Sequence, residues 1–227
     1  MEKVVVSLGG SVLVPGDDDA AHIRRLAALL RELSSTVRIF AVTGGGRISR
    51  YYIETGRALG LAERSLDELG IEVTRMNARL LGAALQGRSN REPATTYSEA
   101  ARLSRRFPIV VMAGTRPGHT TDRVSASLAR LVRARRIVNA TSVDGVYTAD
   151  PKADPNARRI ERMNFEELVG LTGEGHPAAG PSIVFDPVAA HVLARDRIPL
   201  CVVQGRDLGA VRDAILGRPF HGTLVAD

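Results

Sequence analysis

Three glycine-rich turns, each directly after a strand-like segment, are the first candidates for chemistry. They are Gly9–Ser11, Gly44–Gly46 and Gly114–Thr121. Glycine lets backbone N–H groups approach an anion closely, and the start of a following helix adds a favourable dipole. Backbone geometry alone explains one such turn, but three at one sheet edge predict an oligophosphate site. The sequence contains neither GxxxxGK[ST] nor GxGxxG, which excludes the P-loop and dinucleotide fingerprints.

Cationic side chains near these turns are candidates for neutralising phosphate charge. The chain has 31 basic residues, of which only Lys3 and Lys152 are lysines. Lys152 lies in a turn-rich loop, Asp144–Arg158, where it is either a phosphate-binding cation or an ordinary solvated lysine. Arg47 and Arg50 follow the glycine triplet at a predicted helix start, where a guanidinium either reaches the same anion or is only solvated.

The loop Gly114–Thr121 leads into a helical pattern through Asp122. This aspartate is either the N-cap of that helix or a group that organises the transferred phosphate. The loop hydroxyls and a glycine form a possible second phosphate cradle, namely Thr115, Gly118, Thr120 and Thr121. We expect no protein metal site, because the five histidines show no paired ligand spacing.

The elements that position these groups alternate between β-rich runs and segments of helical period. Strands are predicted at 3–8, 37–43, 108–114, 135–141 and 199–204. A helix is predicted over 22–33, with Asp17–Asp19 able to cap it, and a longer one from a capping box at Ser65 and Glu68 to about Gln86. This alternation predicts an α/β fold with a mainly parallel sheet covered by helices on both faces. Ligands of such sheets bind at the carboxyl ends of the strands.

Composition places the chain among globular proteins. It has 227 residues, 44% hydrophobic residues and a mean hydropathy of −0.03, which predicts one domain with a real core. No apolar run approaches the roughly 18–20 residues that cross a bilayer, and the N-terminus lacks a signal-peptide pattern, so we expect a cytoplasmic protein. Its net charge of +6 suits anionic partners, but only 4% of residues are aromatic, so nucleic acid is not expected as the main partner.

Three further features are assigned mainly structural or local roles. Cys201 lies in the apolar run IPLCVV and is expected to be a small buried residue rather than a nucleophile. A basic cluster at Arg130, Arg133, Arg135 and Arg136 is expected to follow a solvated helical surface, with an oligomer contact or an anion site as the alternatives. Residues 173–181 are rich in glycine and proline, which is consistent with a lid.

Taken together, the segments VSLGGSVL, VTGGGRISRYY, DELGIEVTRMNARLL, AGTRPGHTTD and SVDGVYTADPKADPNA resemble the amino-acid-kinase superfamily. They are most similar to its UMP kinases of the archaeal type, and the resemblance spans nearly the whole chain. It implies a three-layer αβα fold, phosphoryl transfer from ATP to UMP, a requirement for Mg²⁺ and a homo-hexamer built as a trimer of dimers. It also implies a single domain, with residues 1–135 mainly binding UMP and 136–227 mainly binding ATP.

The resemblance also implies roles for individual residues. On the ATP side it places Gly10, Ser11, Gly46, Arg50, Ser142, Tyr147 and Asp150. On the UMP side it places Gly45, Asp67, Thr115, Arg116, Pro117, Gly118, His119, Thr120 and Thr121. Asp67 would accept the ribose hydroxyls, while Asp122 and Lys152 would be the catalytic residues.

Two departures from the family pattern and several rival functions accompany this resemblance. Ser7 stands where many superfamily kinases have a lysine, and Ser142 stands where many have asparagine. Isopentenyl phosphate kinase is the nearest rival, but RISRYY supplies Tyr51 and Tyr52 where a histidine is expected. Acetylglutamate or carbamate kinase fits less well, because proline does not follow GGGR. A non-catalytic nucleotide-binding regulatory protein is disfavoured by the retention of Asp122 and Lys152.

Overall fold

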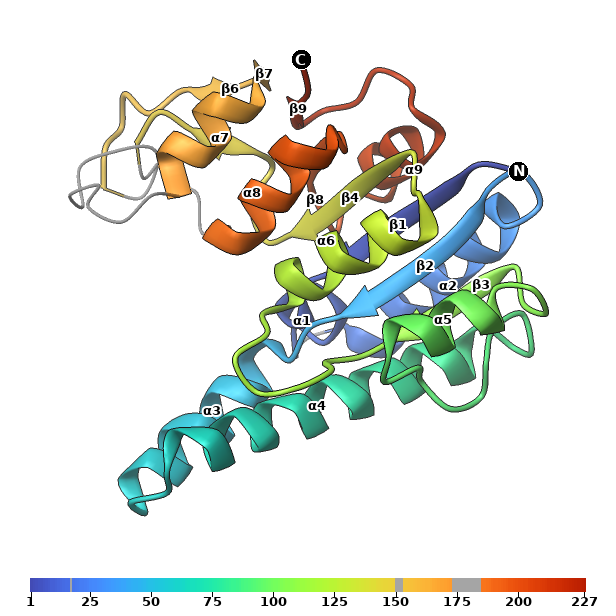
Figure 1. Ribbon diagram of the computed structural model, residues 1–227, viewed down its shortest axis with the longest axis vertical. Helices are drawn as coiled ribbons and strands as arrows, with labels where there is room; N and C mark the ends of the chain where they lie inside the picture. The colour runs from blue at the N-terminus through green and yellow to red at the C-terminus, as the bar shows by residue number, and fades with distance from the viewer. Residues whose placement is uncertain (17, 150–152, 173–184) are drawn as a thin grey trace.

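A single seven-stranded sheet forms the centre of the molecule (Figure 1). The computed structural model describes residues 1–16, 18–149, 153–172 and 185–227. The strand order is β3-β2-β1-β4-β8-β9-β7. Its strands are β1 (Lys3–Leu8), β2 (Arg38–Thr43), β3 (Ile109–Met112), β4 (Arg136–Thr141), β7 (Arg162–Met163), β8 (Leu200–Gln204) and β9 (Thr223–Val225). The first five strands in this order are parallel, whereas β9 is antiparallel to β8, so the predicted mainly parallel sheet is confirmed.

Helices cover both faces of the sheet, which gives the predicted three layers (Figure 1). One face is covered by α2 (Asp19–Leu33), α4 (Glu63–Ala84) and α9 (Leu208–Leu216). The other is covered by α5 (Tyr97–Leu103), α6 (Thr121–Val132), α7 (Phe165–Thr172) and α8 (Pro187–Asp196). The short α1 (Gly10–Leu13) follows β1, and α3 (Gly46–Ala58) follows β2 and packs along α4. No described helix is long and apolar enough to cross a membrane.

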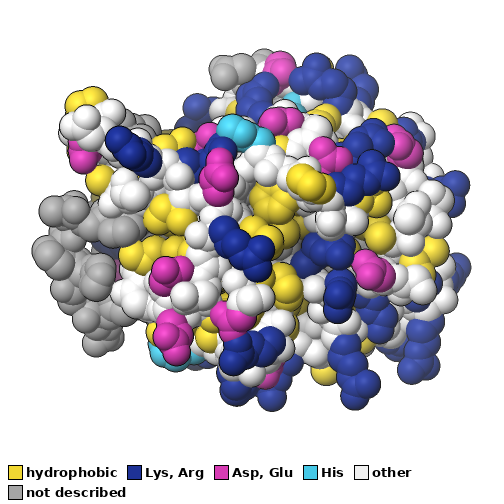
Figure 2. All heavy atoms as spheres, turned by 90° about the horizontal axis from the view of Figure 1, so that it is seen from above, with side chains coloured by type: hydrophobic (Ala, Val, Ile, Leu, Met, Phe, Trp, Pro, Cys, Tyr) yellow, Lys and Arg dark blue, Asp and Glu magenta, His cyan; other side chains and the backbone are white. Residues whose placement is uncertain are grey.

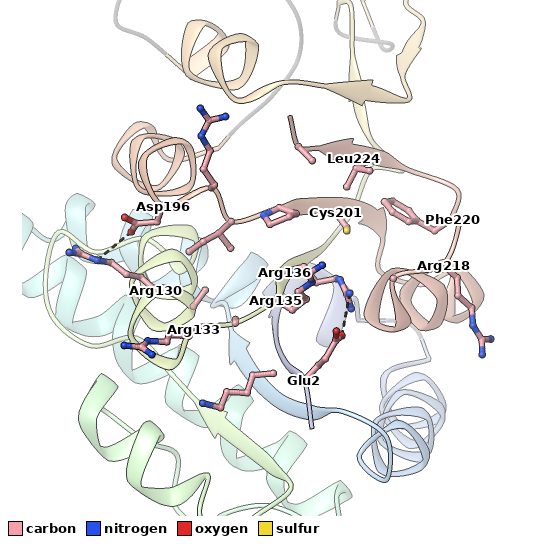
Figure 3. A pocket seen from close by; sticks show the side chains of 18 of the residues that line it. Glu2, Arg130, Arg133, Arg135, Arg136, Asp196, Cys201, Arg218, Phe220 and Leu224 are labelled. Atoms are coloured by element: carbon pink, nitrogen blue, oxygen red, sulfur yellow. Dashed lines mark hydrogen bonds and ion pairs between the residues drawn. The ribbon is translucent and has the colours of Figure 1, made fainter.

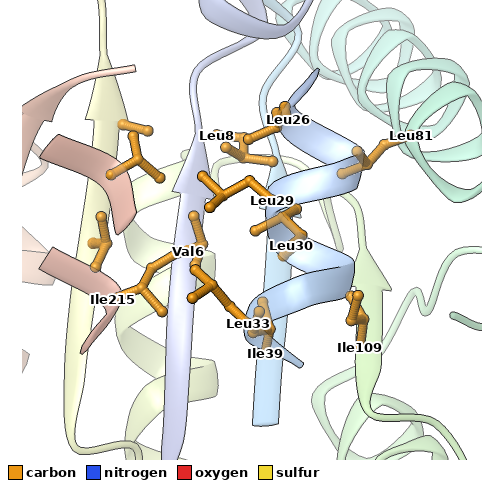
Figure 4. Packing of buried hydrophobic residues seen from close by; sticks show 14 of the residues in the cluster. Val6, Leu8, Leu26, Leu29, Leu30, Leu33, Ile39, Leu81, Ile109 and Ile215 are labelled. Carbon is orange, nitrogen blue, oxygen red and sulfur yellow. The ribbon is translucent and has the colours of Figure 1, made fainter. Parts of the chain in front are cut away.

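The period-two alternation of side chains divides the core into two clusters. In β1, Val4, Val6 and Leu8 belong to the cluster under α2 and α9, as Figure 4 shows for Val6 and Leu8. Val5 points to the opposite cluster, under α6 and α8. Because both faces of the sheet are buried, the parallel strands are mainly apolar along their length, which is why their positions could be predicted closely.

The helix starts differ from the predictions. Helix α4 begins at Glu63 with Ala62 at the N-cap, so the capping box predicted at Ser65 is wrong. The chain leaves the left-handed Gly60 and is already helical at Glu63, which places Ser65 inside the first turn. Asp18 occupies the N-cap of α2 without a capping hydrogen bond, because its carboxylate pairs with arginines instead. Asp17 lies outside the described residues.

Loop predictions are partly confirmed. The Gly114–Thr121 segment is a loop up to the start of α6. Within the predicted loop Asp144–Arg158, β5 (Val146–Tyr147) pairs antiparallel with β6 (Arg159–Ile160), a small sheet that was not predicted. The predicted lid at 173–181 lies outside the described residues. The predicted helical surface of the basic cluster is wrong, because α6 ends at Val132 and Arg136 begins β4.

The first two glycine turns touch each other through backbone alone. A β-carbon on Gly10 would overlap the Gly45 and Gly46 backbone and lie 2.7 Å from the Gly44 oxygen. A β-carbon on Gly46 would overlap Gly10 and lie 2.8 Å from its Cα, and Gly46 has a left-handed φ of +66°. Glycine is therefore required at both positions by contact, and at Gly46 by conformation as well.

This contact yields a stability prediction for Gly46→Ala, with Gly60→Ala as the matched control. Gly60 is also left-handed, but a β-carbon added there would have no atom within 4 Å apart from those of Gly60 itself and its two neighbours in the chain. We expect Gly60→Ala to lower the free energy of unfolding by about 1 kcal/mol from backbone strain, and Gly46→Ala by about 2–5 kcal/mol from strain plus overlap. Urea denaturation at one fixed protein concentration measures both; equal losses would contradict the backbone contact.

Candidate functional site

The contact between the first two glycine turns lies at the carboxyl ends of β1 and β2. It brings together four of the residues predicted for the ATP side: Gly10, Ser11, Gly46 and Arg50. Gly10 and Gly46 lie against each other, and Gly9 N–H donates to the Ala140 oxygen (3.0 Å) at the end of β4. Arg50 Nη2 donates to Ser11 Oγ at 3.2 Å, so one exposed cation lies beside the glycine contact. The N-terminus of α3 opens at the same place, which adds the backbone N–H groups and dipole that favour phosphate.

A pocket of about 330 Å³ adjoins this contact, and Gly45 lines it. Every residue predicted for the UMP side except Thr115 lines the pocket: Gly45, Asp67, Arg116, Pro117, Gly118, His119, Thr120 and Thr121. Thr115 lies next to it, because its hydroxyl is 3.4 Å from His119 Nδ1. The structure therefore gathers residues from α3, α4 and the β3–α6 loop around one cavity.

Helix α4 holds this pocket in shape through three polar side chains. Asp67 Oδ2 accepts from the Gly118 N–H at 2.7 Å, and Thr74 Oγ1 accepts from the Gly114 N–H at 2.8 Å. Asn77 Nδ2 donates to the Gly44 oxygen at 2.8 Å and is buried. One helix therefore fixes both the β3–α6 loop and the glycine triplet. Asn77 and Thr74 were not predicted as functional, although both lie in the segment that carried the family resemblance.

His119 is the centre of the loop's own hydrogen-bond network. Burial and the nearby charges of Arg123 and Arg116 lower its pKa, so the imidazole is neutral at pH 7. Arg116 Nε donates to His119 Nε2 at 2.8 Å, which leaves the proton on Nδ1, facing Tyr97 Oη at 3.3 Å and Thr115 Oγ1. The neutral ring thus aligns Arg116 at the pocket wall.

Asp122 is not the N-cap of α6, so that interpretation is wrong. Thr120 caps the helix by accepting from the Arg123 N–H at 3.1 Å, and Asp122 lies in the first turn. Burial, together with the neighbouring Asp186 charge, raises the pKa of Asp122 to about 7, although a hydrogen bond from the Asp186 backbone N–H acts to lower it. The carboxylate is held in a partly desolvated position beside another acid, a pattern typical of functional sites.

Asp186 is a functional candidate that sequence reasoning missed. Its Oδ2 accepts from Thr120 Oγ1 at 2.8 Å, and its Oδ1 caps α8 by accepting from the Ala189 N–H at 2.9 Å. The Asp-Pro pair before α8 signals a helix start, but no local pattern indicates that this cap meets a loop 66 residues earlier. Asp122 and Asp186 together could contact a divalent cation, since Mg²⁺ is commonly bound by one or two carboxylates plus substrate phosphates. No cluster of three or more metal-binding side chains occurs among the residues that the structure describes.

The predicted adenosine-side residues are only partly described. Ser142 follows β4, and its backbone oxygen accepts from Gln204 Nε2 at 2.9 Å. Tyr147 donates to Asp144 Oδ1 at 2.7 Å. Burial acts to raise the pKa of Asp144, but hydrogen bonds from Tyr147 and His221 outweigh it, and the pKa is lowered overall. Asp150 and Lys152 lie outside the described residues.

Comparison with known proteins agrees with this geometry. The model of the amino acid kinase family matches residues 2–204. A uridylate kinase from Methanoculleus marisnigri is 46% identical over 227 residues, covering 100% of this chain and 97% of that protein. A uridylate kinase from Pyrococcus abyssi is 41% identical over 223 residues, covering 98% and 99%.

Solved structures extend the comparison to three dimensions. The crystal structure of uridylate kinase from Archaeoglobus fulgidus matches with a TM-score of 0.88 and 38% identity over 100% of both chains. UMP kinase from Bacillus anthracis matches with a TM-score of 0.84 at 22% identity, covering 100% of this chain and 96% of that one, which supports the fold alone. The family match across most of the sequence, the archaeal relatives and the shared fold agree, and the chain belongs to the amino acid kinase family.

Proposed function

We propose that this protein is an ATP-dependent UMP kinase that makes UDP and ADP in pyrimidine nucleotide synthesis in the cytoplasm. The observation that carries the proposal is the position of Gly45. It lines the pocket for the acceptor and also belongs to the backbone contact with Gly10, the candidate ATP cradle. A donor phosphate and an acceptor phosphate bound on either side of Gly45 would therefore be neighbours, as direct transfer requires.

The reaction needs positioning and charge neutralisation rather than a covalent intermediate. A phosphate oxygen of UMP attacks the γ-phosphorus of ATP, a new P–O bond forms, and the bond to the β-phosphate oxygen breaks to release ADP. Helices α3 and α6 both begin beside the pocket, since Gly45 and Thr121 line it, and the dipoles at these helix starts favour negative charge on the transferring group. Arg50, beside Ser11, supplies a cation on the donor side.

Binding of the two substrates divides along the chain in this proposal, within a single domain. Residues 1–135 mainly bind UMP, and residues 136–227 mainly bind ATP, with Ser142, Tyr147 and Asp150 around adenosine. The support is that, among the residues that the structure describes, those that line the acceptor pocket all lie between positions 42 and 124. One continuous sheet includes strands from both parts, which keeps the two binding regions in fixed register.

Mg²⁺ is part of the proposal, and Asp122 and Asp186 are the residues that would hold it. Two neighbouring carboxylates, one of them with a raised pKa, are a donor set that a divalent cation would stabilise in the ionised form. When bound, Mg²⁺ neutralises charge on the phosphates. The two carboxylates would hold this cation, and Thr120 keeps Asp186 in place by donating a hydroxyl hydrogen bond to it.

Lys152 is proposed as the second catalytic residue on the basis of the family motif. Ser7 is buried in β1, where the superfamily lysine is often found, so a cation must come from another segment. The proposal also includes a homo-hexamer built as a trimer of dimers. Exposed apolar side chains on α3 and α4 are consistent with an interface there; Tyr51 and Met76 are 64% and 52% exposed.

A coupled assay for ADP release tests the proposed function directly. The acceptors are UMP, CMP, isopentenyl phosphate, acetylglutamate and carbamate, each offered with ATP and Mg²⁺. We expect UMP to give the highest kcat/KM. Faster turnover with isopentenyl phosphate or acetylglutamate would assign another branch of the family, and no turnover with any acceptor would favour a regulatory nucleotide-binding protein.

Substitution of Asp67 is expected to impair the use of UMP more than the use of ATP. Loss of a carboxylate that accepts ribose hydroxyls leaves them unpaired, so Asp67→Ala should raise the KM for UMP at least tenfold, equivalent to about 1.4 kcal/mol. The KM for ATP should stay within threefold. Because Asp67 also accepts from Gly118, Asp67→Asn is the matched control, since its amide oxygen can keep that bond. An unchanged KM for UMP in Asp67→Ala would contradict the ribose role.

Asp122→Asn is expected to affect two properties that can be measured separately: the pH dependence of the free energy of unfolding, and kcat. Between about pH 4 and 7 the folded protein keeps a proton on Asp122 that the unfolded chain has lost, so the free energy of unfolding falls as pH rises through this window. Asparagine removes this dependence and should be at least as stable as aspartate at pH 8. It should also lower kcat at least a hundredfold, because the charge near the phosphates is lost.

Urea denaturation at pH 5 and pH 8, with steady-state kinetics at saturating Mg²⁺, measures both effects of Asp122→Asn. The contribution of all other ionisable groups is common to the two proteins and cancels in the difference. The same change of stability with pH in both proteins would refute the raised pKa. A turnover within threefold of the original protein would refute the catalytic role.

A further inference from the structure

A second, strongly basic pocket lies at the amino-terminal ends of the parallel strands, whereas the glycine turns lie at their carboxyl ends. Figure 3 shows this pocket from close by. It is a cavity of about 950 Å³ between the start of β1, the start of β4 and the C-terminal ends of α6 and α8. We call it the basic pocket; its main cations are Lys3, Arg130, Arg133, Arg135, Arg136 and Arg218. The six residues of β1 separate it from Gly9 by about 20 Å, so a substrate in the catalytic site does not reach it.

The charges that line the basic pocket are strongly unbalanced. Seven basic side chains line it, against the acids Glu2 and Asp196. Ion pairs account for part of the set, because Arg136 pairs with Glu2, Arg130 with Asp196, and Arg197 with Asp227. Among the described residues, the guanidinium groups of Arg133, Arg135 and Arg218 have no ion-pair or hydrogen-bond partner. Figure 2 shows the same excess of Lys and Arg over acidic side chains on the face that it presents.

Capping of helix C-termini explains some of these cations but not the three unpaired ones. Lys3 Nζ donates to the Val132 oxygen at 3.0 Å, and Arg136 Nη1 donates to the Ile215 oxygen at 2.8 Å. These bonds satisfy carbonyls at the ends of α6 and α9, as expected for basic residues at helix C-termini. Arg133, Arg135 and Arg218 are exposed and make no such bond, so an anion from solution remains free to bind them.

The backbone adds an independent observation. Arg133 and Arg197 end α6 and α8 in the left-handed conformation, with φ of 54° and 51°. Glycine or asparagine is favoured at this position, and another residue there costs about 1 kcal/mol. Both helices that end at the basic pocket therefore place an arginine where the backbone disfavours it. A role for positive charge at the rim of the basic pocket would explain why arginine occupies both positions.

The floor of the basic pocket is apolar. Phe220, Ile198 and Cys201 line it beneath the arginines (Figure 3 labels Phe220 and Cys201). Burial raises the pKa of Cys201 to about 12, so its thiol is neutral and contributes only apolar surface. A rim of arginines above an apolar floor matches a small molecule that carries phosphates and a ring or chain, because arginine binds phosphate oxygens in pairs.

We propose that the basic pocket is a second anion-binding site, separate from the catalytic site, for a small molecule that carries two or more phosphate groups. Arg133, Arg135 and Arg218 bind the phosphates, and Phe220 contacts the remainder of the ligand. The site follows from the arrangement of these side chains and does not depend on which acceptor the enzyme phosphorylates.

The probe is inorganic tripolyphosphate, and the reporter is the ring of Phe220. The chain has five phenylalanines, so uniform labelling with fluorophenylalanine gives few ¹⁹F signals, and a Phe220→Leu variant assigns the one from the basic pocket. Binding at the catalytic site does not contact Phe220. The test variant is Arg133→Ala/Arg135→Ala. The matched control is Arg24→Ala/Arg91→Ala, which removes the same charge from two exposed arginines elsewhere.

We expect the Phe220 signal to shift saturably with tripolyphosphate in the original protein and in the control. In the test variant, the apparent affinity should fall at least tenfold, while the KM values for ATP and UMP stay within twofold. An unshifted Phe220 signal in the original protein at millimolar tripolyphosphate would overturn the proposal. Equal loss of affinity in the test and control variants would also overturn it, because it would indicate attraction to net charge alone.

Discussion

The backbone contact between Gly10 and Gly45–Gly46 is the constraint on which the rest of the site depends. It joins the ends of two neighbouring parallel strands at a distance that no side chain permits. The short α1 and the long α3 start from this contact, so their free N–H groups converge on one region. A substrate with several phosphates needs many donors in a small volume, and backbone amides provide them without bulk. The contact therefore determines where phosphate chemistry can occur.

Helix α4 transmits that constraint to the acceptor pocket. Asp67, Thr74 and Asn77 are spaced by seven and three residues, which places them along one side of a helix. Each bonds a different part of the site: the Gly118 N–H, the Gly114 N–H and the Gly44 oxygen. Rotation or displacement of α4 would disturb all three at once. The glycine triplet and the β3–α6 loop are thus anchored to a rigid 22-residue helix.

The sequence predicted those parts of the molecule that have a local signal. The five parallel strands could be predicted because each is a mainly apolar, β-branched run, and the glycine turns because they follow such runs. Strands β5, β6, β7 and β9 have only two or three residues and depend on their partners, so no periodicity predicted them. The start of α4 was misplaced because the left-handed Gly60 outweighs the Ser65 capping pattern. Asp186 was missed because its role depends on a contact with Thr120, far away in the chain.

The Asp122–Asp186 pair suggests how the site responds to its substrates. A carboxyl with a pKa near 7 is partly protonated at neutral pH while no cation is close to it. In the proposed mechanism, a cation that arrived with the phosphates would favour the ionised form of Asp122, so its binding would be coupled to release of a proton from that carboxyl. Asp122 would then carry a buried charge only when a compensating charge is beside it, which would avoid the free energy cost of burying an isolated charge. This coupling would require Asp122 to stay desolvated beside Asp186, and Asp186 is itself fixed by its hydrogen bonds to Thr120 and to the start of α8.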